Sequence, residues 1–183
     1  MEIFMKNLLA SFALACLCVF SFAQNPSIIR PRIEIAESGS EEDVGLMVFY
    51  MDDESPRTYY LSLGPLGIGT EIVQVGFDPI FELFIPLGNT LDEAIAKMEE
   101  IKGFYQLPKK ETAEIEVCFA ALYPNDTRVT ATVTPRRLLI SRMLEFSIPT
   151  DTEGVVRATH INKSDFSILL GGLKLHQRLH PSE

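Results

Sequence analysis

The segment from Thr90 to Gly103 constrains the fold more than any other stretch, because it is the one clear amphipathic helix in the 183 residues. Thr90 and Glu93 have the spacing of a capping box, in which each side chain accepts a hydrogen bond from a free backbone N–H group. Apolar residues recur on a single stripe, at Leu91, Ala94, Ile95, Met98 and Ile101. Such a helix must bury its stripe, and the rest of the sequence offers only β-strands as its partner.

Short segments on both sides of this helix have the patterns of strands, either alternating apolar and polar residues or continuous apolar runs. The expected strands cover residues 33–35, 44–51, 57–63, 71–76, 80–85, 115–123, 128–134, 137–148, 155–161 and 166–175. Local turns between successive strands favour an antiparallel meander. We therefore predict an α+β fold, in which one amphipathic helix, about residues 91–102, packs on a face of a mostly antiparallel sheet.

The first 23 residues have the regions of a secretory signal peptide, namely a basic start, an apolar run and a small-residue cleavage site. We predict cleavage after Ala23, a single domain over residues 24–183, and a secreted or periplasmic location. The apolar run is shorter than the roughly 20 residues that cross a bilayer, so we expect no stable membrane span. A lipoprotein anchored through Cys16 is disfavoured, because Ala13 stands where bacterial lipoproteins usually carry leucine.

The charge of the chain is acidic and uneven, with a formal net charge of −9. Residues 24–127 hold 7 basic and 19 acidic residues (7 − 19 = −12), whereas residues 128–183 hold 8 basic and 5 acidic residues (8 − 5 = +3). An acidic chain without a large basic stripe is unsuited to nucleic acid, because phosphate neutralisation dominates such binding. The split charge would suit a charged protein partner or head-to-tail association, and the alternative interpretation is a charge that serves ordinary solubility. Exposed strand edges would also allow a homo-oligomer by sheet extension.

Two acidic clusters in predicted loops are the candidate surface for that partner: Glu41, Glu42, Asp43, Asp52, Asp53 and Glu54. Calcium-binding loops space their acidic residues at alternate positions and place a glycine at the turn. The acidic residues of each cluster are consecutive instead. We therefore interpret both clusters as solvated loops that face a partner, and we predict no cofactor.

Glu82 is the candidate catalytic residue, because it interrupts the apolar run of residues 80–85. A carboxylate in apolar surroundings has a raised pKa, which suits acid–base chemistry. The alternative is a structural carboxylate, either on an edge strand or paired with an arginine such as Arg57, Arg137 or Arg142.

His176 and His180 are the candidate metal ligands, because histidines four residues apart converge on one metal ion if their segment is helical. They precede Pro181 at the end of the chain, and no acidic residue accompanies them, so a frayed polar tail is the alternative interpretation. Cys118 is the one cysteine left after cleavage, and its apolar neighbours predict a buried, inert thiol.

The sequence lacks the nucleophile elbow G-x-S-x-G, the redox motif C-x-x-C, the zinc motif H-E-x-x-H and a phosphate-binding loop. The leading hypothesis is a secreted or periplasmic, non-catalytic binding module of the cell envelope. The alternatives are a small hydrolase-type enzyme that uses Glu82 and a histidine, and a metal-stabilised structural domain.

Overall fold

The computed structural model describes residues 32–38, 46–65, 67–68, 81–121, 123–138, 140–149 and 156–181. These residues form nine strands, two α-helices and one short 3-10 helix. In chain order the elements are β1 (Arg32–Glu37), β2 (Leu46–Met51), β3 (Tyr59–Pro65), β4 (Gly67–Ile68), β5 (Phe81–Gly88), α2 (Leu91–Gly103), η1 (Phe104–Gln106), β6 (Ala113–Ala121), β7 (Arg128–Leu138), β8 (Ser141–Pro149), β9 (Val156–Asn162) and α3 (Lys163–Leu179).

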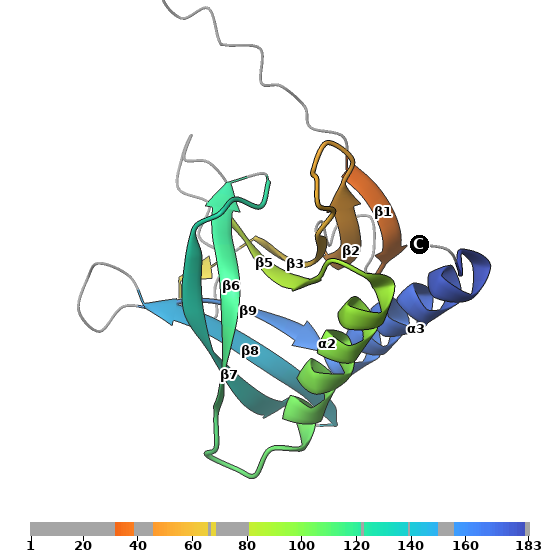
Figure 1. Ribbon diagram of the computed structural model, residues 1–183. Helices are drawn as coiled ribbons and strands as arrows, with labels where there is room; N and C mark the ends of the chain where they lie inside the picture. Colours follow the sequence, from red (N-terminus) through yellow and green to blue (C-terminus); the bar gives the residue numbers. More distant parts are fainter. Residues whose placement is uncertain are drawn as a thin grey trace, which may run out of the picture.

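All the strands belong to one antiparallel sheet, in the order β1-β2-β3-β5-β6-β7-β8-β9-β4. Most neighbours in the sheet are also neighbours along the chain, which confirms the predicted meander and the α+β class (Figure 1). The short β4 continues β3 after one residue and pairs with β9. The hydroxyl of Thr159 in β9 also donates a hydrogen bond of 3.0 Å to the carbonyl oxygen of Leu63 in β3. The sheet therefore curls until its later strands meet β3.

The predicted helix is confirmed as α2, together with its capping box. The backbone N–H of Glu93 donates to the Thr90 hydroxyl at 3.2 Å, and that of Thr90 donates to the Glu93 carboxylate at 3.3 Å. Leu91, Ala94, Met98 and Ile101 are buried, as their spacing predicts, while Ile95 is half-buried.

The predicted strand at residues 166–175 is wrong, because this segment belongs to the 17-residue helix α3. Its two adjacent glycines suggested a bulge, yet Phe166, Leu169, Leu170 and Leu173 have helical spacing and are buried. Gly172 is required by packing: a Cβ atom at this position would lie 2.6 Å from the Cβ atom of Ala36 in β1. The glycine therefore allows α3 to lie close against the first strand.

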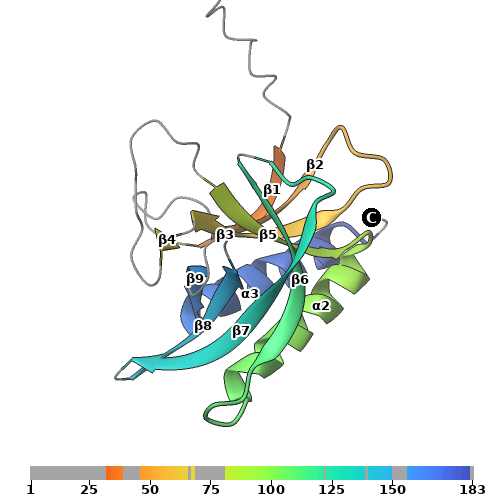
Figure 2. The ribbon, with the colours of Figure 1, turned by 90° about the vertical axis from the view of Figure 1, so that its left-hand side faces the viewer.

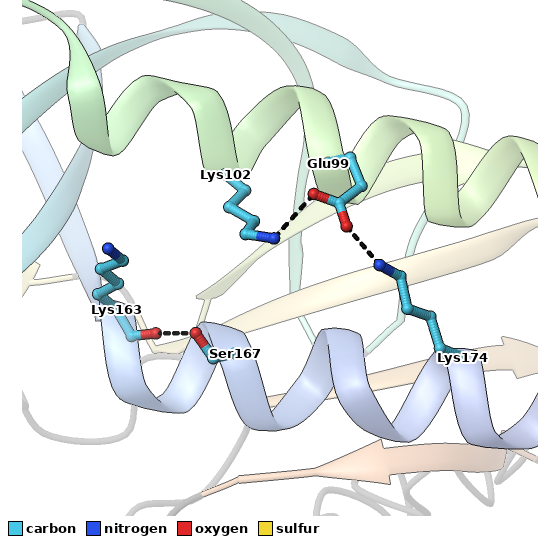
Figure 3. A network of polar contacts seen from close by, with 5 residues as sticks. All are labelled: Glu99, Lys102, Lys163, Ser167 and Lys174. Atoms are coloured by element: carbon cyan, nitrogen blue, oxygen red, sulfur yellow. Dashed lines mark hydrogen bonds and ion pairs between the residues drawn. The ribbon is translucent and has the colours of Figure 1, made fainter.

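The main core lies between one face of the sheet and the two helices, which lie side by side (Figure 1). Polar contacts also join the helices. The carboxylate of Glu99 in α2 accepts hydrogen bonds from Lys102 in the same helix and from Lys174 in α3 (Figure 3). These two hydrogen bonds lower the pKa of Glu99. The helices thus form one layer over the sheet.

The predicted strand at residues 137–148 is confirmed from Ser141 onward, where it is β8, but its start is wrong, because residues 137–138 belong to β7 and the chain reverses before Ser141 to form the β7–β8 hairpin. Pairing between β6 and β7 ends at Val133, whereas pairing between β7 and β8 continues to Leu138 and Ser141. The end of the hairpin is therefore a two-stranded ribbon. Pro135 fits there because β6 no longer needs its missing N–H group. Figure 2 shows this ribbon at the lower end of the molecule.

Candidate functional site

Glu82 lies on β5, on the sheet face turned away from the helices. Leu83 and Ile85 belong to the core beneath the helices, so the alternation of a strand places Glu82 and Phe84 on the opposite face. That face carries a second buried apolar cluster, made of Met47, Phe49, Met51, Tyr60, Phe84, Cys118 and Ala120. A carboxylate beside such a cluster is partly removed from water.

The carboxylate of Glu82 accepts a hydrogen bond of 3.2 Å from the hydroxyl of Ser62, which is itself fully buried. The Ser62 oxygen in turn accepts the backbone N–H of Gly64 at 3.3 Å. Burial raises the pKa of Glu82, while the positive charge of Arg32 and the hydrogen bond from Ser62 oppose that rise. Among the described residues, no buried side-chain nitrogen or oxygen lacks a hydrogen-bond partner.

The arginine that influences Glu82 is not one of the three considered from the sequence. Arg32 acts on it from β1, and the Arg32 guanidinium also lies 4.6 Å from the ring centre of Phe49. Arg57 instead lies 4.0 Å from the ring centre of Tyr50, and Arg137 and Arg142 lie at the far end of the sheet. Glu82 is also in an interior strand of the sheet, between β3 and β6, and not on an edge.

His176 and His180 both lie at the end of α3, where their rings stack at 4.4 Å between centres. The segment is therefore helical up to Leu179, as a shared metal ion would need. No group of three or more potential ligands is assembled within the described part of the chain. His160 lies on β9, opposite Glu145 in β8.

The first acidic cluster, Glu41 to Asp43, lies outside the described residues. In the second cluster, Asp52 and Asp53 are exposed in the turn between β2 and β3, and the Glu54 carboxylate accepts a hydrogen bond of 3.4 Å from the hydroxyl of Tyr60. The role of this turn in partner binding stays a prediction.

Cys118 is a buried free thiol on β6, as its sequence context predicts. Burial raises its pKa, which disfavours the reactive thiolate. Its sulfur accepts the backbone N–H of Asn125 at 3.0 Å and lies 3.2 Å from the Asn125 side-chain oxygen. The thiol therefore ties β6 to the following turn.

A different feature emerges at the end of the molecule where the β7–β8 ribbon meets the connector between η1 and β6. An open groove of about 700 Å³ lies there. Its uncharged lining residues are Tyr105, Gln106, Leu107, Thr134, Pro135 and Met143. Tyr105 is held in place by its hydroxyl, which donates a hydrogen bond of 3.0 Å to the carbonyl oxygen of Ile161. Five basic residues complete the lining: Lys109, Lys110, Arg136, Arg137 and Arg142.

The positive charge of this groove is largely uncompensated. Arg136 donates to Glu145 at 2.8 Å, which raises the pKa of the arginine. Within the described part of the chain, the other four basic side chains make no hydrogen bond or ion pair. We call these four the groove cations: Lys109, Lys110, Arg137 and Arg142. Like charges that converge without a counter-ion repel one another, so their arrangement favours an anionic ligand.

Arg137 and Arg142 face each other directly across the ribbon, since they are register partners of β7 and β8. Like charges opposite each other in an antiparallel pair destabilise it. This pairing of two arginines therefore does not stabilise the folded ribbon. A bound anion between them would remove the repulsion.

Lys109 and Lys110 are presented by a tight turn in which the backbone N–H of Glu111 donates to the Pro108 carbonyl at 3.0 Å. Lys110 has a φ of 77°, a left-handed conformation that β-branched and long side chains rarely adopt. A type II turn requires positive φ at its third position, where glycine is usual. Lys110 therefore places a positive charge at the groove although its backbone conformation is unfavourable for lysine.

The sequence alone did not reveal this groove. Its cations come from two short segments, Lys109–Lys110 and Arg136–Arg142, which are separated by β6 and most of β7. Neither segment has the length of a basic tract. The one available signal was the run of arginines around Leu138–Ile140, a stretch with none of the residues that usually form turns.

Comparisons with protein-family models, with curated proteins and with solved structures find no match for this chain. Neither described helix combines the length and the apolar character that a transmembrane span requires.

Proposed function

We propose that this protein is a non-catalytic binding module of the cell envelope, secreted or periplasmic, that holds an anionic partner in its basic groove. The observation that carries the proposal is the set of four groove cations, which have no counter-ion among the residues that the structure describes, in a chain whose formal net charge is −9. The signal-like N-terminal sequence supports a location outside the cytoplasm.

The geometry of the groove suits multivalent anions better than a single small ion. Its cations come from two elements, the ribbon and the lysine turn, and apolar residues line the same groove. Arginine guanidinium groups bind phosphate and carboxylate oxygens through pairs of hydrogen bonds, and lysine adds a compact point charge. Ligands with several phosphate or carboxylate groups would satisfy both sides together.

The proposal is tested by calorimetric titration of the purified protein with inorganic tripolyphosphate, at low and at high salt. We expect saturable binding that weakens with salt, because screening reduces attraction between exposed charges. The double variant Arg137→Gln/Arg142→Gln should lower the affinity by about ten-fold or more, since hydrogen bonds to charged groups contribute about 1.5–3 kcal/mol each.

The matched control is the double variant Lys97→Gln/Arg178→Gln, which removes the same charge elsewhere. Lys97 lies on α2, and Arg178 lies near the end of α3, about 22 Å along that helix from its start. The control should bind like the unmodified protein. Absence of binding, or an equal loss in both double variants, would contradict the proposal.

An enzyme that uses Glu82 remains the second candidate, because the pKa of this carboxyl is raised beside the Ser62 hydroxyl. A carboxyl group with a raised pKa is suited to general acid–base chemistry. The test is the turnover of chromogenic ester, phosphate and glycoside substrates by the protein and by Glu82→Gln. An activity that disappears in a folded Glu82→Gln variant would favour the enzyme, and an activity that the variant retains would exclude Glu82 from it.

A further inference from the structure

We propose that the β7–β8 ribbon docks the protein on an anionic lipid surface, with Ile140 entering the headgroup layer and the groove cations contacting lipid phosphates. This inference rests on the proposed function, and it names the partner of the same groove. It depends on three features of the ribbon: an exposed apolar apex, the cations directly behind the apex, and the projection of both beyond the body of the sheet.

Ile140 forms the apolar apex. It is 98% exposed, more than any other large apolar side chain in the described ranges; the next are Leu179 at 67% and Ile168 at 56%. Hairpin turns usually consist of glycine, asparagine, aspartate, proline or serine, which suit the backbone and water. Here Ile140 lies in the turn, between Leu138 at the end of β7 and Ser141 at the start of β8. Transfer of an exposed apolar side chain such as Ile140 from water to an apolar medium is favourable.

The cations stand directly behind this apex. Arg137 and Arg142 are register partners, one on each strand, and each lies within three residues of Ile140. Peripheral membrane proteins combine these two features, because apolar side chains enter the acyl boundary while lysine and arginine remain at the level of the phosphates. The mutual repulsion of the two arginines would be relieved by phosphate groups between them.

The ribbon also has room to reach a surface. It continues beyond the last residue pairs that join β6 to β7 and β8 to β9, namely Ala113 with Val133 and Met143 with Asn162. The connector that carries Lys109 and Lys110 lies at the same end of the molecule as the ribbon, as both views show (Figures 1 and 2). A flat anionic surface could therefore meet the apex and both pairs of cations together.

A soluble anion would account for the cations alone. Ile140 does not line the groove, so a small phosphorylated ligand or an acidic peptide in the groove would leave the apex in water. A lipid surface accounts for the apex and the cations together, which is why we favour it over a soluble ligand.

The test is co-sedimentation of the protein with vesicles of phosphatidylcholine, with and without one third phosphatidylglycerol. We expect binding only to the anionic vesicles. Attraction to such a surface contributes about 1 kcal/mol per basic residue, which is about five-fold in partition coefficient. The double variant Arg137→Gln/Arg142→Gln should therefore bind about 25-fold more weakly.

Replacement of the apex separates insertion from charge. Ile140→Ser should lower the partition coefficient by about ten-fold, because burial of one isoleucine side chain is lost. Its control is Leu179→Ser, which removes an exposed apolar residue at the end of α3 and should change nothing. Thermal unfolding of each variant verifies that it is folded.

Three results would overturn the inference: no preference for anionic vesicles, full binding by Ile140→Ser, or an equal loss in Leu179→Ser. Titration with tripolyphosphate then distinguishes the two levels of the proposal. Binding of tripolyphosphate without vesicle binding would refute the lipid surface and retain the anion-binding groove. Absence of both would refute the groove as well.

Discussion

Glu82 and the basic groove use charge in opposite ways. The Glu82 carboxyl lies half-buried in the sheet, next to an apolar cluster, with a serine hydroxyl and an arginine to stabilise it. The groove cations lie at the surface, where water could solvate an isolated charge, yet they line one groove and have no counter-ion within the described ranges of the chain. The half-buried Glu82 carboxyl thus has a hydrogen-bond donor and a nearby positive charge, whereas the exposed groove cations have no such partners among the described residues.

This comparison indicates that the groove cations, and not the Glu82 carboxylate, are the feature that suggests a ligand. A lone carboxylate in an apolar run attracts notice in a sequence, but its partners within the fold can explain it completely. Several cations brought together from separate segments have no such explanation, since repulsion among them costs stability. We therefore expect substitutions in the packed interior to change the stability of the protein, and substitutions in the groove to change its binding.

The largest expected effect is a loss of stability on substitution of a residue in the packed interior. Met98 is fully buried between α2 and the sheet, so Met98→Ala removes packed methylene groups and leaves a cavity. Such substitutions lower the free energy of unfolding by about 2–5 kcal/mol. Chemical denaturation measures this change, and tripolyphosphate affinity of the folded fraction should stay the same. A loss below about 0.5 kcal/mol would contradict the packing of α2 on the sheet.

Glu82 should behave as part of that interior. Glu82→Ala leaves the buried Ser62 hydroxyl without its acceptor, which should lower the free energy of unfolding by about 1–3 kcal/mol. Glu82→Gln keeps an oxygen acceptor and should cost less. Urea denaturation of both variants makes the comparison. If Glu82→Ala were as stable as the unmodified protein, the hydrogen bond would have no structural role.

The pH dependence of stability provides a second view of Glu82. Its pKa is higher in the folded chain than the ordinary value of 4.5, so the folded state retains a proton that the unfolded state releases. Stability therefore falls as pH rises through the interval from 4.5 to the folded pKa, and Glu82→Gln removes this dependence. The stability difference between the protein and Glu82→Gln should shift in favour of the unmodified protein as the pH is lowered. A difference that does not change with pH would contradict the raised pKa.

A smaller effect separates backbone strain from charge at Lys110. Because its φ is 77°, Lys110→Gly should raise the free energy of unfolding by up to about 1 kcal/mol. Lys110→Gln keeps the strained conformation and should raise stability less, only through the lost repulsion among the groove cations. Both variants lose the charge and should bind tripolyphosphate more weakly to the same extent. Unequal binding would show that the turn geometry, and not the charge, matters for the groove.

The smallest expected effect is an increase in stability, whereas most substitutions lower the stability of a protein. Arg137→Gln/Arg142→Gln removes the repulsion across the ribbon, and should raise the free energy of unfolding by about 0.2–1 kcal/mol while it weakens anion binding. Thermal unfolding at low salt, where the repulsion is strongest, provides the measurement. A clear loss of stability would mean that the arginines have partners that support the fold.

The sequence predicted those parts of the fold in which local chemistry and packing agree. Helix α2 has the cap and the buried stripe that its sequence predicts. The expectation that Gly103 ends the helix in a left-handed conformation is wrong, because Gly103 has right-handed helical φ and ψ and the chain continues into η1. Strands β6 and β7 pair as their alternation predicts, with Val117 opposite Val129. Helix α3 was missed because two glycines weaken its local propensity, while the reason for Gly172 is the close approach of Ala36, 136 residues earlier (172 − 36 = 136).

The ribbon was missed for a related reason. Its turn lacks the residues that favour reversal, so the local sequence of residues 137–148 favours a continuous strand. Sequences depart from local rules chiefly where function or a distant contact requires it. The position where the strand prediction fails is thus also the position that carries the exposed Ile140 and the facing arginines.

The contact between α3 and β1 determines when the domain can fold during synthesis. Beside the close approach of Gly172 to Ala36, the Ser38 hydroxyl donates a hydrogen bond of 3.2 Å to Asp165, across 127 residues of sequence. The first described strand is therefore covered only after the last helix has been synthesised. A chain truncated before residue 163 would expose the apolar face of its sheet and would aggregate instead of forming a smaller domain.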